Sequence, residues 1–509
     1  MKKLLRIILL VGQIFYLLNQ LFADLKVHGL FSDNMVLQQG TTVPVWGWAN
    51  EGEIVTVQIQ NQKATAKVKN GQWMAKLKNL NPGGPYELVV YTLTETIRFT
   101  NVLVGEVWLC SGQSNMEWPL SKTENPDPII QSATNSLIRF VTIPHTNLKT
   151  PTNNVYVRWV ECTPSTVSNF SAVAYYFGRE LQRSLCVPVG LVLSSWGGTA
   201  AEQWTSEKAL KSVPRLRDEI LLSYEKALQE YEEALKKWEQ SGRTNARPRA
   251  PRLPSGLYNG MIAPLIPFAI RGVIWYQGES NADRADQYRV LFPTLIWDWR
   301  SAWGKHDLPF IFVQLAPYRP IKPDPSESAW AELREAQLLT MKKVKNTGMV
   351  VITDAGDPQD IHPKKKEPVG VRLARAALAI AYGEPIEWSG PIFSRMVIKG
   401  EKAIVYFDHV DGGLACPDPE IKGFAICGPD GKFVWAKAEI IASNAVAVYS
   451  PLVEKPMAVR YGWADCPVVN LYNKEGLPAS PFRTDNFPLL TAPKKQVVDR
   501  KSSSQPKSK

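Results

Sequence analysis

Short β-rich runs fill the first part of the chain after residue 24, and turn-forming residues separate them. Four such runs cover residues 43–48, 54–59, 64–68 and 86–91. Short β-rich runs between turn signals predict strands, so residues 24–100 are predicted to form a small β-sandwich. We interpret it as a structural domain, with carbohydrate binding as the alternative role.

The pattern then changes to continuous apolar runs, which are separated by stretches long enough for helices. These runs cover residues 104–109, 187–193, 309–315 and 348–353. Strands buried on both faces and alternating with helices predict a doubly wound α/β domain over residues 101–385. β-rich runs return at 403–407 and 445–449, so residues 386–490 are predicted to form a second β-sandwich-like region.

Residues 206–250 interrupt the α/β rhythm with a helical pattern. Apolar residues recur there at three- and four-residue spacing among charged ones: Leu221, Tyr224, Leu228, Tyr231, Leu235 and Trp238. This spacing predicts an amphipathic helix, alone or as half of a helical hairpin. We interpret it as a packing element or an insertion at the rim of the active site. A dimer-forming coiled coil is the alternative, although about two and a half heptads is short for one.

The two ends of the chain differ from the folded body. Residues 1–23 combine a basic start with an apolar stretch, which predicts a secretory signal peptide and a periplasmic or secreted protein. Gln13, Asn19 and Gln20 interrupt the stretch and argue against a lasting membrane anchor, the alternative for this segment. Residues 491–509 are polar, basic and without periodicity, which predicts a disordered tail.

The length of the chain indicates how many domains to expect, and its net charge bears on whether it binds nucleic acid. A chain of 509 residues is too long for one core, so two or three domains are expected. The formal net charge is +11, but residues 1–23 carry three of these charges and residues 494–509 a net five, which leaves +3 for the rest. Such a body gives no argument for nucleic-acid binding.

The cysteine spacing does not indicate zinc binding. The six cysteines show no CxxC or Cys/His spacing of a zinc site. Cys416 and Cys427 flank a predicted turn and could form a disulfide in an oxidising compartment, whereas Cys110 is expected to be a buried thiol.

Ser114 is the candidate nucleophile. It follows the apolar run at 104–109, and Gly112 supplies conformational freedom for a sharp turn. A hydroxyl presented at the carboxyl end of a sheet strand lies where open α/β folds keep their sites. Backbone N–H groups of the same turn can point at an oxyanion.

A serine hydroxyl needs a base, and His362 is the best of the five histidines. It lies in a loop after a predicted strand, with acids just before it, whereas His145 lies in a loop without an acidic neighbour. Asp360 can accept from its Nδ1–H and leave Nε2 for Ser114. Asp357 and Asp354 are the fallback acids.

Four sequence blocks carry a family resemblance. They are Gly-Gln-Ser-Asn-Met at 112–116, Ser-Ser-Trp-Gly-Gly-Thr at 194–199, Val-Ile-Trp-Tyr-Gln-Gly-Glu-Ser-Asn-Ala at 273–282 and Asp-Ile-His-Pro at 360–363. This ordered set, with Tyr-Gly-Trp-Ala-Asp at 461–465, resembles bacterial sialate O-acetylesterases of the SGNH (GDSL-like) hydrolase superfamily. Many SGNH enzymes place the acid three residues before the histidine, where this chain has Gln359. The branch of the family that this chain resembles has Asp-Ile-His-Pro instead, so the resemblance assigns the role of the acid to Asp360.

An acyl-transfer enzyme also needs donors for the oxyanion. The candidates are the Ser114 N–H and the backbone of Gly197 or Gly198. The resemblance adds a side-chain amide from the third block, Gln277 or Asn281, and we favour Gln277 at the strand end. Glu279 in the same block receives no role.

The resemblance implies a metal-free, cofactor-free serine esterase that removes O-acetyl groups from sugars, with O-acetylated sialic acids as the favoured substrate. An acetylesterase acting on xylan or another plant polysaccharide is the first alternative. A noncatalytic sugar-binding protein is the second. A lipid esterase or thioesterase is less favoured, because the chain shows no long apolar lid segment.

Overall fold

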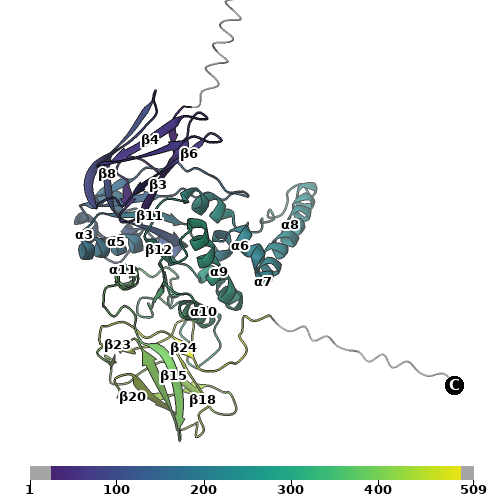
Figure 1. The fold of residues 1–509 in the computed structure, drawn as a ribbon. Coiled ribbons are helices and arrows are strands. Elements are labelled where there is room, and N and C mark those ends of the chain that lie inside the picture. The colour runs from purple at the N-terminus through teal and green to yellow at the C-terminus, as the bar shows by residue number, and fades with distance from the viewer. Residues whose placement is uncertain (1–23, 494–509) are drawn as a thin grey trace, which may run out of the picture.

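The computed structural model describes residues 24–493, and its two ends are β-rich with helices between them (Figure 1). The signal peptide predicted at 1–23 lies outside the described residues, as does the predicted tail beyond residue 493. No helix among the described residues is long and apolar enough to cross a membrane.

The N-terminal part consists of two facing sheets. One contains β1 (Lys26–Val27), β3 (Thr42–Trp48) and β6 (Gln72–Lys78). The other contains β4 (Ile54–Ile59), β5 (Gln62–Lys67), β7 (Gly83–Tyr91) and the first half of β8 (Thr96–Gly112). Alternating residues such as Val43 and Val45 of β3 and Val55 and Val57 of β4 are buried in the same apolar cluster.

Strand β8 joins this part to the central sheet without a break. Its first half pairs antiparallel with β7, and its middle pairs with β2 (Val36–Gln38). Its second half pairs in parallel with β11 (Val189–Ser195) and β12 (Gly272–Tyr276). The boundary expected at residue 100 therefore falls inside one 17-residue strand.

The central sheet has the order β10-β9-β11-β8-β12-β13-β14. Its remaining strands are β9 (Asn135–Thr142), β13 (Phe310–Val313), β14 (Thr347–Val350) and the antiparallel edge strand β10 (Val160–Cys162). All other neighbours along this order pair in parallel.

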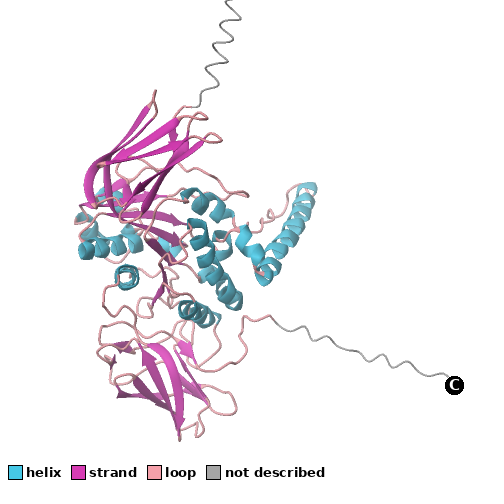
Figure 2. Ribbon diagram, in the orientation of Figure 1, coloured by secondary structure: helices cyan, strands magenta, loops and turns pink. Residues whose placement is uncertain are grey.

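Helices cover both faces of the central sheet (Figure 2). Val107 and Leu109 of β8 share an apolar cluster with α9 (Ala285–Trp303) and α10 (Ala329–Lys343). The alternate residues Trp108 and Cys110 share a second cluster with α5 (Ala172–Leu185) and α11 (Glu367–Tyr382). A strand buried on both faces needs apolar residues at every position, which explains its continuous apolar run. The architecture is therefore mixed α/β with large sheets.

The C-terminal part is a second pair of sheets. One has the order β15 (Ile392–Lys399), β16 (Lys402–Asp408), β21 (Ala445–Tyr449) and β20 (Lys437–Ala442). The other has the order β19 (Val434–Trp435), β18 (Phe424–Cys427), β22 (Ala458–Tyr461) and β24 (Phe482–Arg483). Val405, Val446, Ile426 and Phe482 meet in one buried cluster between them. The short strands β17 (Leu414–Ala415) and β23 (Tyr472–Asn473) form a separate pair.

The helical segment inserted after β11 projects from the body (Figure 1). It contains α6 (Glu207–Ser212), α7 (Pro214–Leu216), a π-helical turn (Arg217–Leu222) and α8 (Ser223–Gln240). The predicted amphipathic helix is confirmed; residues 246–253 after it contain neither helix nor strand, and the next helical segment includes a π-helical turn at Tyr258–Ile262. Trp238 of the apolar stripe donates a hydrogen bond from Nε1 to the carbonyl oxygen of Asn245 at 2.6 Å.

All six cysteines are free thiols in the structure. The Cys416–Cys427 disulfide considered from the sequence is therefore not formed. Cys110 is buried, as expected, and burial raises the pKa of its thiol, which keeps the thiol protonated.

Candidate active site

Ser114 stands at the carboxyl end of β8. The strand ends at Gly112, whose φ is +138° and where an added Cβ would lie 2.1 Å from the Tyr276 carbonyl oxygen. Glycine is needed here because β12 passes so closely. Ser114 then opens the short helix α2 (Ser114–Glu117), where the first N–H groups lack partners within the helix.

His362 meets the serine from the loop between β14 and α11. Its Nε2 lies 2.8 Å from Ser114 Oγ, and its ring stacks on Trp118 with centroids 4.8 Å apart. Burial lowers the pKa of His362, against the opposing effect of Asp360. The imidazole is therefore neutral at neutral pH and able to take a proton from the serine.

Of the three acids predicted for this loop, Asp360 faces the imidazole. Its Oδ1 lies 3.6 Å from His362 Nδ1 and accepts the backbone N–H of His362 at 2.8 Å. Asp357 Oδ1 accepts the N–H groups of residues 359 and 360 and so caps the loop. Asp354 forms two hydrogen bonds with Arg372, at 2.7 and 2.6 Å.

Gly197 borders the serine, but its N–H already has an acceptor. A Cβ at this position would lie 3.3 Å from Ser114 Cβ. The Gly197 N–H donates to Glu117 Oε2 at 2.6 Å, so it can bind an oxyanion only after Glu117 releases it. Gly198 has a φ of +70° and open space around its Cβ position.

The two amides of the third block are buried and hydrogen-bonded to each other. Gln277 Nε2 donates to Asn281 Oδ1 at 2.7 Å and to the Thr199 carbonyl oxygen at 3.3 Å. Asn281 Nδ2 donates to Glu202 Oε2 at 2.9 Å. These bonds tie the third block to the glycine block, and oxyanion binding by either amide stays a prediction.

A buried polar network, which the sequence did not reveal, lies behind the serine. Asn115 Nδ2 donates to Glu279 Oε1 at 2.5 Å and to the Ile361 carbonyl oxygen at 3.0 Å, while Asn115 Oδ1 accepts from Lys366 Nζ. Burial lowers the pKa of Lys366 to about 7 and raises the pKa of Glu279. Asn115 and Glu279 lie in the recognised sequence blocks and Lys366 follows one of them, but the sequence spacing does not indicate that the three side chains are in contact.

A second missed pair lies on the other side of the serine. His145 Nε2 is 2.9 Å from Glu117 Oε1, and its ring stacks on Trp196 with centroids 4.3 Å apart. Sequence reasoning set His145 aside for want of an acidic neighbour. The acid, Glu117, directly follows the serine block, 28 positions earlier in the chain.

Metal-ligating side chains do not gather anywhere in residues 24–493, where no group of three or more His, Cys, Asp or Glu residues is placed to hold an ion. The side chains at the site are those of acid–base and nucleophilic chemistry.

Comparisons with known proteins cover the same elements. A family model described as "Carbohydrate esterase, sialic acid-specific acetylesterase" matches residues 104–379, which run from the middle of β8 into α11. The sialate O-acetylesterase of Mus musculus is 32% identical over 505 residues, which cover 89% of this chain and 93% of the mouse protein. The sialate O-acetylesterase of Homo sapiens is 29% identical, with 89% and 91% covered.

A solved structure extends the similarity to the whole fold. The crystal structure of a novel carbohydrate acetylesterase from Xanthomonas citri superposes with a TM-score of 0.80 at 38% sequence identity. The superposition covers 91% of this chain and 100% of that one, so it includes both β-rich ends as well as the central sheet.

Proposed function

The chain belongs to the sialate O-acetylesterase family of carbohydrate esterases, and we propose that it removes O-acetyl groups from sugars by the serine mechanism of SGNH hydrolases. The observation that carries the mechanism is the 2.8 Å contact between Ser114 Oγ and His362 Nε2 at the carboxyl end of β8. A hydroxyl and a neutral imidazole at this distance form a nucleophile and its general base.

In the proposed reaction, His362 Nε2 takes the Ser114 proton as Oγ bonds to the acetyl carbonyl carbon. Asp360 stabilises the imidazolium that forms. The bond between the acetyl carbonyl carbon and the sugar oxygen then breaks, and the sugar oxygen leaves with the proton returned by His362. Water, deprotonated by His362, releases acetate and regenerates Ser114.

The negative carbonyl oxygen needs preorganised donors. We assign the Ser114 N–H first, then Gly197 or Gly198, with Gln277 or Asn281 as the side-chain amide. Loss of one such donor costs about 3 kcal/mol of transition-state stabilisation.

We favour O-acetylated sialic acids as substrates. The mammalian relatives are named for this activity. Exposed lysines also surround the histidine loop: Lys364 and Lys365 lie in it, and Lys122 Nζ lies 5.7 Å from the Trp118 ring centroid. Positive charge near the site suits a sugar that carries a carboxylate. Acetylated xylan remains the second candidate, because the similar solved structure is described only as a carbohydrate acetylesterase.

Acetate release from 9-O-acetylated sialic acid, measured beside acetylated xylan oligomers, tests the function. We expect turnover of both, with the sialic acid preferred. Ser114→Ala and His362→Ala should each abolish turnover with the fold retained, and Ser114→Ala should also abolish labelling by a fluorophosphonate. Well-folded wild type that neither turns over nor labels would support the noncatalytic sugar-binding alternative.

For the location we propose the periplasm or the exterior of the cell, on the basis of the signal-peptide pattern at residues 1–23.

A further inference from the structure

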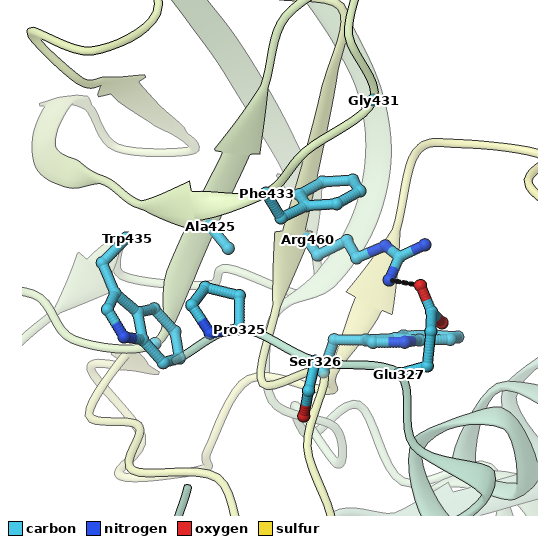
Figure 3. Close-up of a pocket in the computed structure, with 10 residues that line it drawn as sticks. Pro325, Ser326, Glu327, Ala425, Gly431, Phe433, Trp435 and Arg460 are labelled. Atoms are coloured by element: carbon cyan, nitrogen blue, oxygen red, sulfur yellow. Dashed lines mark hydrogen bonds and ion pairs between the residues drawn. The ribbon is translucent and has the colours of Figure 1, made fainter. Parts of the chain in front are cut away.

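A cavity of about 220 Å³ lies where the segment between β13 and α10 meets the C-terminal sheets (Figure 3). Its wall is aromatic on the side of the sheets, where Phe433, Trp435 and Trp463 line it. Pro325, Glu327 and Arg460 complete it. An adjoining cavity of about 320 Å³ shares Trp435, Trp463 and Pro325 with the first, and we refer to the two cavities as the compartments of one candidate site.

Trp435 is the exposed aromatic residue of this site. It is 47% exposed, and its Nε1 donates to the Pro323 carbonyl oxygen at 2.7 Å. The indole is therefore held by its polar edge while much of its surface remains open to a ligand. A large aromatic surface that is both fixed and exposed binds ligands with little loss of side-chain entropy.

The charges of the first compartment are paired within the protein. The Arg460 guanidinium binds Asp485 at 2.7 and 3.1 Å and Glu327 at 2.8 Å, and it lies 4.2 Å from the Phe433 ring centroid. The charged residues among those that line the second compartment are two lysines and two carboxylates, Lys322, Lys422, Asp324 and Glu420. Neither compartment therefore has an excess of positive charge that would select an anion.

The lining instead matches an uncharged sugar chain. Aromatic rings pack against the apolar C–H face of a sugar ring, and a carboxylate accepts hydrogen bonds from sugar hydroxyls. The Glu327 side chain is 47% exposed, so its oxygens remain accessible in addition to the Arg460 contact.

We propose that these two compartments bind a neutral oligosaccharide stretch of the glycan, one sugar ring in each, at a position separate from the ester-cleaving site. This inference rests on the proposed function only in one respect: the glycan is identified as the one that carries the ester.

The segment that forms the cavity also contacts the catalytic loop. The Pro317 carbonyl oxygen accepts the Asp357 N–H at 3.2 Å, three residues before Asp360. Gly356 packs so closely on Pro317 that a Cβ there would lie 2.5 Å from the proline ring. One segment thus touches both sites, as expected if a single extended substrate engages both.

Calorimetric titration of the wild-type protein with xylohexaose and with cellohexaose tests the site. Both are neutral and carry no ester, so binding does not depend on hydrolysis. We expect at least one of them to bind, Trp435→Ala to weaken that binding about tenfold or more, and Trp435→Phe to retain part of it. Trp297→Ala is the matched control, because Trp297 is 48% exposed but lies on α9, and it should bind as wild type does.

A second readout uses ester substrates. Trp435→Ala should hydrolyse p-nitrophenyl acetate as wild type does, but with a raised KM on acetylated xylo-oligosaccharides. No binding of either hexaose to wild type, or equal binding by Trp435→Ala, would overturn the proposal. Tighter binding of 3′-sialyllactose than of lactose, its neutral part, would refute a neutral ligand. If the wild-type protein binds a hexaose but shows no esterase activity, only the proposed function is contradicted.

Discussion

The side-chain amide of Asn115 donates a hydrogen bond to the carbonyl oxygen of Ile361 at 3.0 Å. This bond ties the residue after Ser114 to the residue before His362. The proposed nucleophile and its proposed base come from segments 248 positions apart, and here their backbones are joined by one buried side chain. Lys366 and Glu279 hold that side chain in turn.

Replacing Asn115 should therefore separate the serine from its base. We expect Asn115→Ala to lower kcat about 10²-fold with a smaller change in KM, because the bonds to Ile361, Glu279 and Lys366 are lost together. Asn115→Asp should be at least as damaging, since it turns an acceptor toward the Glu279 carboxylate. Steady-state kinetics on p-nitrophenyl acetate, with circular dichroism as the folding control, measures this. If Asn115→Ala has the same kcat as wild type, the hydrogen bonds of Asn115 are not needed to position the serine and its base.

The identity of the catalytic acid is open to a paired test. Asp360→Asn should lower kcat by orders of magnitude, up to about 10⁴-fold, since the imidazolium loses its stabilising charge. Asp357→Asn keeps a side-chain oxygen for the loop N–H groups and should have a much smaller effect. If the two variants exchange these phenotypes, Asp357 is the acid.

The buried lysine should influence the pH dependence of the reaction. The positive charge of Lys366 lowers the pKa of His362, so its removal should raise that pKa. The reaction needs neutral His362, and we expect the acidic limb of the kcat/KM profile to move to higher pH in Lys366→Met. The exposed neighbour Lys365 provides the control, and Lys365→Met should leave the limb in place. A shift toward lower pH would contradict this assignment of charge.

Helices α5 and α11 cross closely at Gly370. A Cβ there would lie 2.5 Å from Tyr176 Cβ and 2.8 Å from the Val173 carbonyl oxygen, both on α5. We expect Gly370→Ala to lower the free energy of unfolding by about 1–3 kcal/mol, because the helices must move apart. Denaturant unfolding would measure the change, and a variant as stable as wild type would mean that the helices adjust without cost.

Chelation should not affect the reaction. The proposed mechanism uses only side-chain and backbone groups, so dialysis against EDTA should leave acetate release unchanged. Loss of activity that an added divalent ion restores would overturn the metal-free mechanism.

Local sequence signals predicted the elements that carry the reaction. The continuous apolar run ending at Gly112 predicted a buried strand that presents Ser114, and β8 is that strand. The loop histidine with a preceding acid predicted the contact that the structure places at 2.8 Å. Both signals are short-range, because a strand and the turn after it are encoded within about ten residues.

Contacts between distant segments could not be predicted in this way. His145 is paired with Glu117 only because β9 and β8 lie in one sheet on either side of β11. The apolar stripe of α8 predicted a helix correctly, but it did not predict the segment without helix or strand at residues 246–253 that follows it. Asn115 reads as an ordinary polar turn residue until tertiary structure buries it between two charged groups.

Strand β8 also limits how this protein can be rearranged. One uninterrupted backbone carries the wall of the N-terminal sheets at one end and delivers the nucleophile at the other. The N-terminal part is therefore not a module that can be trimmed, exchanged or grafted at its apparent boundary. A single-residue insertion within the strand would turn every later side chain to the opposite face and bring Val107 to the helices that now pack on Trp108. A shift of register in one part would therefore also displace side chains in the other.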